Sequence, residues 1–89
     1  MVAISFTSNL QRHVPCPPTN VQGGTVGEVL EQVFAANPRL RSYLVDEQGR
    51  LRKHVNIWLD DKAIEDRLEL SDTVANDTRL YVFQLLTGG

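Results

Sequence analysis

Apolar residues alternate with small or polar residues over residues 2–7. A period of two, with β-branched and aromatic side chains in the apolar set, is typical of a strand that is buried on one side. The expected inward side chains are Val2, Ile4 and Phe6, and the expected outward ones are Ala3, Ser5 and Thr7. Residues 2–7 are therefore expected to form the first strand of a sheet.

The next two segments have weaker patterns. Residues 8–14, "SNLQRHV", have the composition of a hairpin turn region. Residues 15–24 hold three of the four prolines and end on two glycines. Proline cannot donate a hydrogen bond to a sheet ladder. Any strand in this second segment is therefore expected to be short and to lie at an edge of the sheet.

A regular helical pattern covers residues 25–37. Thr25 and Glu28 have the spacing of a capping box, in which the hydroxyl accepts from the third helical amide and the carboxylate reaches back. Asn37 suits a left-handed cap, and Pro38 prevents the helix from continuing. The apolar residues that recur at helical spacing are Val26, Val29, Leu30, Val33 and Phe34. The pattern predicts an amphipathic helix with one buried face.

The second half of the chain contains shorter elements. Alternation over residues 54–61 predicts a strand, with Val55, Ile57 and Leu59 inward and Asn56 and Trp58 outward. Alternation over residues 79–86 predicts a final strand, with Leu80 and Val82 inward and Tyr81, Phe83 and Leu85 outward. The remaining expectations are a short helical turn at residues 40–44, turns at 46–49 and 76–77, and a very short strand within 60–65.

This order of elements favours an α+β domain, in which one main helix covers one face of a mixed sheet. The simplest closure is the β-grasp (ubiquitin-like) arrangement, with the first and last strands side by side and parallel in the middle. We expect residues 1–86 to form this domain and residues 87–89 to form a flexible diglycine tail.

Length, charge and cysteine count exclude several domain organisations and classes of function. A chain of 89 residues fits one domain. A net charge of -2 argues against a general nucleic-acid partner. The single cysteine, Cys16, excludes an internal disulfide and a cysteine-rich zinc site. Without a signal peptide or a long apolar run, the chain is expected to be soluble and cytoplasmic, with no membrane partner.

Conventional catalytic and metal-binding patterns are weak. We interpret His13 and His54 as surface or turn residues, and Cys16 as a loop thiol without an activating partner. The glycines near residue 25 match no phosphate-binding motif. The basic run at residues 50–54 fits a solvated strand entry better than a partner contact. The acidic residues between positions 60 and 66 lack calcium-loop spacing, so we interpret them as solvated turn residues and expect no metal site.

Two features favour a function in binding and carrying. The first is the uncovered outward face of the sheet, where aromatic side chains suggest a partner site rather than scattered exposed apolar residues. The side chains expected on this face are Trp58, Tyr81, Phe83 and Leu85. The second is the tail, Thr87, Gly88 and Gly89, which reaches about 10 Å when extended. Glycine has no side chain to clash in a narrow channel.

The chemistry of such a tail follows from its carboxylate, which is ionised at neutral pH and is therefore a poor electrophile. It can attack the α-phosphate of ATP on a partner enzyme and form an acyl-adenylate. A sulfur donor can then displace AMP and leave a thiocarboxylate. This chemistry needs no catalytic side chain and no bound cofactor in the chain itself.

Four stretches, "VAISF", "GGTVGEVLEQV", "HVNIWLDDKAIE" and "RLYVFQLLTGG", resemble the ubiquitin-like sulfur carriers of the MoaD/ThiS family, most closely the cysteine-pathway carriers. The proline-rich segment departs from that pattern. The resemblance implies that a ubiquitin-activating-type enzyme adenylates Gly89 with ATP, and that a biosynthetic enzyme accepts the sulfur. It also implies that Gly88 and Thr87 thread the active site of the partner and that Leu86 and Phe83 contact the partner.

Three alternatives stay open at this point. The chain could be a permanent small subunit of a complex such as molybdopterin synthase, with its tail in the large subunit. It could be a ubiquitin-like modifier that is joined to lysines through Gly89. It could also be a binding module without C-terminal chemistry.

Overall fold

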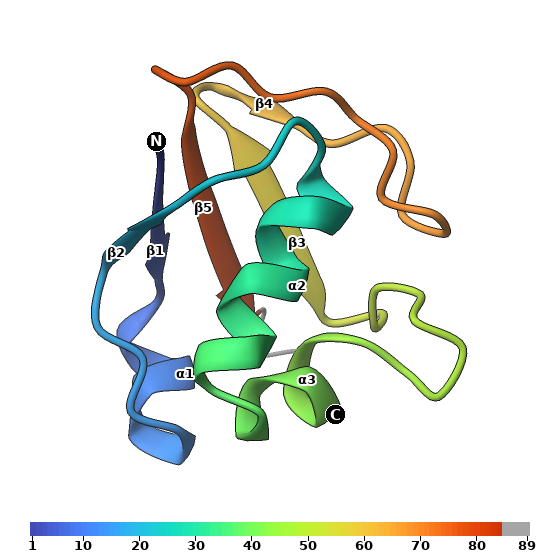
Figure 1. The fold of residues 1–89 in the computed structure, drawn as a ribbon. Helices are drawn as coiled ribbons and strands as arrows, with labels where there is room; N and C mark the ends of the chain where they lie inside the picture. Colours follow the sequence, from blue (N-terminus) through green and yellow to red (C-terminus); the bar gives the residue numbers. More distant parts are fainter. Residues whose placement is uncertain (85–89) are drawn as a thin grey trace.

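The computed structural model describes residues 1–84, apart from the side chains of Asn9 and His13. The elements of this part of the chain, labelled in Figure 1, are β1 (Val2–Phe6), α1 (Ser8–His13), β2 (Thr19–Val21), α2 (Val26–Ala36), α3 (Arg39–Leu44), β3 (Val55–Leu59), β4 (Lys62–Ala63) and β5 (Arg79–Gln84). The predictions for Leu85, Leu86, Thr87, Gly88 and Gly89 concern residues outside the described part of the chain.

The strands form one mixed sheet in the order β2-β1-β5-β3-β4. The central strands β1 and β5 are parallel, with Ile4 opposite Leu80. The pairs β1–β2, β3–β5 and β3–β4 are antiparallel. The sequence prediction of the topology is therefore confirmed: the first and last strands lie side by side in the middle, and the second strand lies at an edge.

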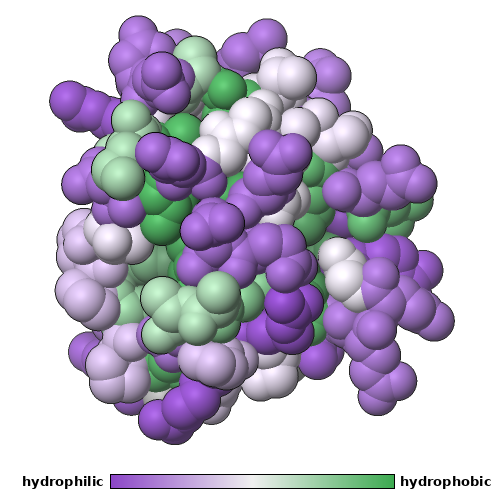
Figure 2. Space-filling view, in the orientation of Figure 1, coloured by the Kyte–Doolittle hydropathy of each residue, from purple (hydrophilic) through white to green (hydrophobic). Residues whose placement is uncertain are grey.

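Helix α2 crosses one face of this sheet (Figure 1). Its apolar stripe packs against the inward side chains of the strands, as the periodicity predicts. Full burial of an aliphatic side chain contributes about 1.5–3 kcal/mol relative to exposure. The side chains with the smallest exposed fractions include Val2, Ile4, Val26, Val29, Val55, Ile57, Leu80 and Val82. On the outside of the helix-covered face, hydrophilic residues separate small apolar areas (Figure 2).

The start of α2 has the predicted cap. The hydroxyl oxygen of Thr25 accepts a hydrogen bond from the backbone N–H of Glu28 at 3.2 Å. The Glu28 carboxylate also reaches back, but it accepts from the N–H of Gly24 at 2.7 Å and not from Thr25 itself. The first contact satisfies a backbone donor that the helix leaves without an intrahelical partner, and the second satisfies the donor of the residue before the cap.

The end of α2 differs from the prediction. Asn37 has φ -144° and ψ 78°, so it is not in the left-handed conformation. Pro38 follows it, and the proline ring pushes the preceding residue towards extended backbone angles. The Asn37 side chain instead donates from Nδ2 to the carbonyl of Pro15 at 2.8 Å. Asn37 therefore ties the end of α2 to the proline-rich segment.

The prediction of a hairpin turn at residues 8–14 is wrong, because Ser8–His13 form helix α1. Leu10 and Val14 are both fully buried, and the N–H of Val14 donates to the carbonyl of Leu10 at 3.1 Å. The four-residue spacing of these two apolar residues was the signal for this helix. The short helix takes the chain from β1 towards the edge strand β2.

The edge position of the second strand is confirmed, but the prolines are not part of it. Pro15, Pro17 and Pro18 precede β2, which begins at Thr19. Strand β2 itself contains no proline. The prolines lie in the segment that leads the chain into this edge strand. The predicted helical turn at residues 40–44 is confirmed as α3, with Leu40 and Leu44 buried.

Candidate functional site

The outer face of the sheet, opposite α2, carries three aromatic side chains, Trp58, Tyr81 and Phe83, which we call the aromatic face. Trp58 on β3 stands directly opposite Tyr81 on β5. Their exposed fractions are 38% and 42%, whereas Leu80 and Val82, which flank Tyr81 along β5, are buried on the other side of the sheet. The alternation of β5 therefore places its aromatic residues outward, as the sequence predicts.

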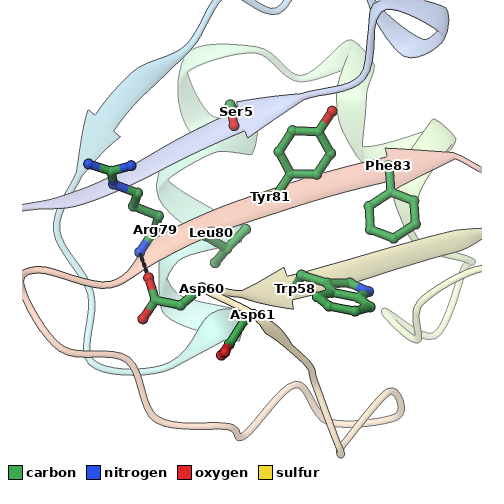
Figure 3. Close-up of a pocket in the computed structure, with 8 residues that line it drawn as sticks. All are labelled: Ser5, Trp58, Asp60, Asp61, Arg79, Leu80, Tyr81 and Phe83. Atoms are coloured by element: carbon green, nitrogen blue, oxygen red, sulfur yellow. Dashed lines mark hydrogen bonds between the residues drawn. The ribbon is translucent and has the colours of Figure 1, made fainter.

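The three rings form one continuous surface (Figure 3). The ring centroids of Trp58 and Phe83 are 6.3 Å apart, and those of Tyr81 and Phe83 are 5.7 Å apart. Both pairs have interplanar angles of 48°. These are the separations at which aromatic rings attract one another, so the surface is held in a defined shape. Aromatic residues exposed together in this way are enriched at protein interfaces.

The aromatic face is hollowed into a depression of about 720 Å³. Its lining residues are Ser5, Trp58, Asp60, Asp61, Arg79, Leu80, Tyr81 and Phe83 (Figure 3). The small side chain of Ser5, opposite Tyr81 on the neighbouring strand, leaves the depression open on the β1 side. Catalytic sites for small substrates usually enclose most of the ligand and exclude water. An open depression over a flat sheet suits a protein surface better.

One rim of the depression is fixed by two hydrogen bonds between Asp60 and Arg79. The N–H of Asp60 donates to the carbonyl of Arg79 at 2.8 Å, and the N–H of Arg79 donates to Oδ1 of Asp60 at 3.0 Å. Asp60 has φ 56°, a left-handed angle that an aspartate tolerates better than most residues. The turn between β3 and β4 is therefore locked to the start of β5.

The other end of β5 is the root of the tail. Gln84, the last residue of the strand, pairs with Val55 on β3. On the opposite side, the N–H of Thr7 donates to the carbonyl of Val82 at 3.1 Å. The chain thus enters residue 85 from a strand that is held on both sides. The predicted site residues Leu85, Leu86, Thr87, Gly88 and Gly89 follow this root.

The remaining candidates have structural explanations. Cys16 is 3% exposed, and desolvation by burial raises the pKa of its thiol, which lowers the fraction of reactive thiolate. A Cβ on Gly23 would lie 2.8 Å from a methyl carbon of Val29, and one on Gly27 would lie 3.3 Å from the carbonyl oxygen of Leu70. These glycines therefore permit close packing. His54 is exposed, in the turn before β3.

Within residues 1–84, no three His, Cys, Asp or Glu side chains gather closely enough to hold a metal ion. In the same part of the chain, every helix is too short or too polar to cross a membrane.

The acidic residues between positions 60 and 66 do not all behave as solvated turn residues. The Asp66 carboxylate accepts hydrogen bonds from the backbone N–H groups of Glu69 at 2.9 Å, Leu68 at 3.1 Å and Ser71 at 3.3 Å. It also accepts from the Ser71 hydroxyl. The bond from Glu69 is the largest cause that lowers the pKa of Asp66 to about 2. Asp66 therefore organises the turn that leads into Leu70.

A second contact that sequence reasoning missed lies beside the aromatic face. The Arg67 guanidinium donates from Nη1 to the side-chain oxygen of Asn56 at 3.0 Å, and from Nη2 to the carbonyl of Arg52 at 2.7 Å. Asn56 stands opposite Phe83. Arg67 thus links the turn before β3 to the edge of the aromatic face. The basic run at residues 50–54 was the only sequence signal for a charged site in this region.

Comparison with known proteins adds to this geometry. No protein-family model matches the chain, and no curated protein matches its sequence. Solved structures do match. CysO in the BexX/CysO complex of Amycolatopsis orientalis has 22% identity over 100% of both chains, with a TM-score of 0.84. Mycobacterium tuberculosis CysO, described as an antigen, has 21% identity over 97% of this chain and 100% of its own, with a TM-score of 0.81.

A third match is SAMP1, the small archaeal modifier protein 1 of Haloferax volcanii. It has 24% identity over 99% of this chain and 98% of its own, with a TM-score of 0.79. Identities at this level show the fold and do not by themselves transfer a function. The chain therefore has the α+β, ubiquitin-like β-grasp fold that CysO and SAMP1 share over their whole lengths.

Proposed function

We propose that this chain is a ubiquitin-like sulfur carrier of the MoaD/ThiS kind, which carries sulfur as a thiocarboxylate on Gly89. The strongest support is the combination of a C-terminal glycine pair with the fold that carries it. A Gly88–Gly89 pair follows the central strand of a β-grasp fold that matches CysO with a TM-score of 0.84. In this proposal the chain is a co-substrate of its partner enzymes and is not itself an enzyme.

The proposed chemistry proceeds in two balanced steps on the partner. A carboxylate oxygen of Gly89 attacks the α-phosphorus of ATP, a new oxygen–phosphorus bond forms, and pyrophosphate leaves with its bridging oxygen. A hydrosulfide ion then attacks the acyl carbon of the adenylate, a carbon–sulfur bond forms, and AMP leaves. The thiocarboxylate that results can transfer its sulfur to a biosynthetic enzyme that makes cysteine or another sulfur-containing metabolite. ATP belongs to the partner throughout.

In this proposal the aromatic face is the surface by which the adenylating enzyme holds the domain. A ubiquitin-activating-type adenylating enzyme must hold the domain while the tail reaches its ATP. The exposed Trp58 and Tyr81, with the half-buried Phe83 beside them, offer the aromatic anchors on which protein interfaces depend. The same sheet carries the root of the tail at Gln84. Docking through this face would therefore fix where Leu85, Leu86, Thr87 and Gly88 start towards the active site.

ATP–pyrophosphate exchange tests the proposal. The wild-type chain is incubated with a recombinant ubiquitin-activating-type enzyme of the same organism, ATP and labelled pyrophosphate. We expect exchange with the wild type and none with a variant that carries one extra alanine after Gly89, because the added residue displaces the carboxylate. Equal exchange with and without the extra alanine would overturn the proposal. A second variant, Gly24→Ala, serves as a control for handling and folding.

A second candidate function has a specific observation in its favour. SAMP1, with a TM-score of 0.79, is described as a modifier protein. If this chain is also a modifier, the activated Gly89 forms an isopeptide bond with a lysine Nζ of a target protein, and AMP leaves. Tryptic digestion would then reveal target lysines that carry residues 80–89, because Arg79 is the last tryptic site before Gly89. A carrier predicts the thiocarboxylate without such remnants.

A further inference from the structure

Four basic side chains, Arg52, Lys53, His54 and Arg67, gather where the tail begins; we call them the basic cluster. Three of them directly precede β3, whose first residue, Val55, pairs with Gln84 at the end of β5. Figure 1 shows the turn before β3 at the same end of the sheet as the C-terminal end of β5. The basic cluster therefore lies beside the point from which residues 85–89 depart.

No ion pair within residues 1–84 involves the basic cluster, although the Asp46 carboxylate lines the same depression as Lys53 and His54. The ion pairs in this part of the chain are Arg41–Glu31 and Arg50–Asp46. Arg50 thus compensates one of the two carboxylates on the neighbouring turn, Asp46 and Glu47. Lys53 and His54 are exposed to solvent. A surface depression of about 500 Å³ runs along this turn and includes both of them.

The two arginines of the cluster are held in place by neutral oxygen atoms. Arg52 donates from Nε to the carbonyl of Ser42 at 2.8 Å. Arg67 donates to the carbonyl of Arg52 and to the side-chain oxygen of Asn56. Neutral acceptors fix the position of a guanidinium without forming an ion pair with it. The cluster is therefore an oriented positive surface on a chain whose net charge is -2.

The basic cluster is continuous with the aromatic face. Arg67 contacts Asn56, and Asn56 stands opposite Phe83 across β3 and β5. A partner that covers Phe83 and receives the tail would also face these positive side chains. A surface that meets a positive cluster favourably carries carboxylates. A long polyanion such as nucleic acid fits less well, because the chain as a whole is acidic.

We propose that the basic cluster binds an acidic stretch of the adenylating enzyme, at the mouth of the channel that receives the tail. This inference rests on the proposed function and names the charge of the surface that the enzyme must present. Complementary charges of this kind speed association and fix the orientation of the encounter. They act before the carboxylate reaches ATP, so they affect KM and its salt dependence more than kcat.

The chain supplies its own matched control, because its lysines are Lys53 and Lys62. Both are exposed, and they flank the two ends of β3, which spans roughly 17 Å. Lys53→Glu and Lys62→Glu make the same change in charge on the same side-chain type. Only Lys53 belongs to the basic cluster. Any general effect of net charge is therefore common to both variants.

The test measures ATP–pyrophosphate exchange with the recombinant adenylating enzyme as a function of chain concentration and salt. We expect Lys53→Glu to lower kcat/KM about threefold to tenfold at low ionic strength, through KM, and to flatten its salt dependence. Lys62→Glu should behave as the wild type. Equal effects of the two variants would overturn this inference and leave the proposed function standing. Absence of exchange with the wild type would overturn both.

Carbodiimide cross-linking gives a second readout that does not depend on turnover. The reagent joins an amine to a carboxylate as an amide and takes up the water that is lost. In the complex of the chain with the enzyme, we expect an amide between Nζ of Lys53 and an aspartate or glutamate of the enzyme. Peptide mapping that finds such links from Lys62 and none from Lys53 would contradict the proposed contact.

Discussion

Trp58 and Tyr81 stand opposite each other on β3 and β5, and the Phe83 ring contacts the rings of both. The arrangement follows from the period of two in both strands, which sends Ile57 and Val82 into the core and the aromatic residues outward. Two adjacent strands thus bring together side chains that are more than 20 residues apart in sequence. The aromatic face is therefore a product of the sheet register.

Replacement of Trp58 with alanine should weaken binding to the adenylating enzyme far more than it weakens the fold. We expect KM in ATP–pyrophosphate exchange to rise about 30-fold, the effect of losing an interface anchor worth about 2 kcal/mol. The free energy of unfolding in urea should fall by about 1 kcal/mol at most, because Trp58 is 38% exposed. Trp58→Phe should restore most of the affinity. An unchanged KM for Trp58→Ala would show that the aromatic face is not part of the interface.

The cap of α2 should contribute measurably to stability. Thr25→Ala removes the oxygen that accepts from the N–H of Glu28. Loss of such a cap costs about 1 kcal/mol in the free energy of unfolding, which urea denaturation followed by circular dichroism measures. Thr25→Ser keeps the accepting oxygen and should lie within a few tenths of the wild type. If the alanine and serine variants were equally stable, the hydrogen bond would have no net effect.

Two adjacent glycines should differ sharply in their tolerance of a methyl group. A Cβ on Gly23 would lie 2.8 Å from Cγ2 and 2.9 Å from the backbone nitrogen of Val29, so Gly23→Ala must displace the first turn of α2. We expect a loss of about 1–3 kcal/mol in unfolding free energy, as for other overpacked sites. A Cβ on Gly24 would meet only the carboxylate oxygen of Glu28 at 3.4 Å. Gly24→Ala should therefore be close to neutral, and similar losses for both variants would contradict the packing argument.

Acid should destabilise the fold partly through Asp66. Its pKa is about 2 in the folded chain, against an ordinary value of 3.8. A lowered pKa in the folded state stabilises the fold above pH 3.8, and this contribution is lost as the pH falls through about 2. The pKa of Asp46 is also lowered, chiefly by the hydrogen bond from the N–H of Arg50. Asp46 therefore also stabilises the fold less as the pH falls.

The Asp66→Asn variant should therefore show a shallower fall of unfolding free energy between pH 4 and pH 2 than the wild type. Asp61→Asn is the matched control, because within residues 1–84 the exposed carboxylate of Asp61 accepts no hydrogen bond. Chemical denaturation at a series of pH values measures the slope. Equal slopes for the wild type and Asp66→Asn would show that the turn around Asp66 does not retain its hydrogen bonds in solution.

Strong local patterns made most of the fold predictable from the sequence. The period of two in β1, β3 and β5 and the apolar stripe of α2 each specify an element and its buried side. Errors occurred where two local rules competed or where the local signal was too short. At Asn37 the tendency of asparagine towards the left-handed conformation was overridden by the extended preference that Pro38 imposes. In α1 the only helical signal was the pair Leu10 and Val14, which is too short to be distinctive.

The candidate site was predictable in part for the same reason. Outward exposure of Trp58, Tyr81 and Phe83 follows from strand alternation and from the position of a single main helix. The contact of Arg67 with Asn56 spans 11 residues and depends on how the segment after β4 folds back, which no local pattern encodes. Long-range placement of charged side chains therefore required the structure.

The central claim is that Gly89 carries sulfur, and the intact mass of the chain tests it most directly. The wild-type chain is incubated with its adenylating enzyme, ATP and hydrosulfide, and is then analysed by mass spectrometry beside a variant that lacks Gly88 and Gly89. The account predicts that the wild-type mass rises by the difference between one sulfur and one oxygen atom, that fragmentation places the change on Gly89, and that the shortened variant is unchanged. A wild-type mass that stays constant while the same enzyme adenylates the chain would contradict it.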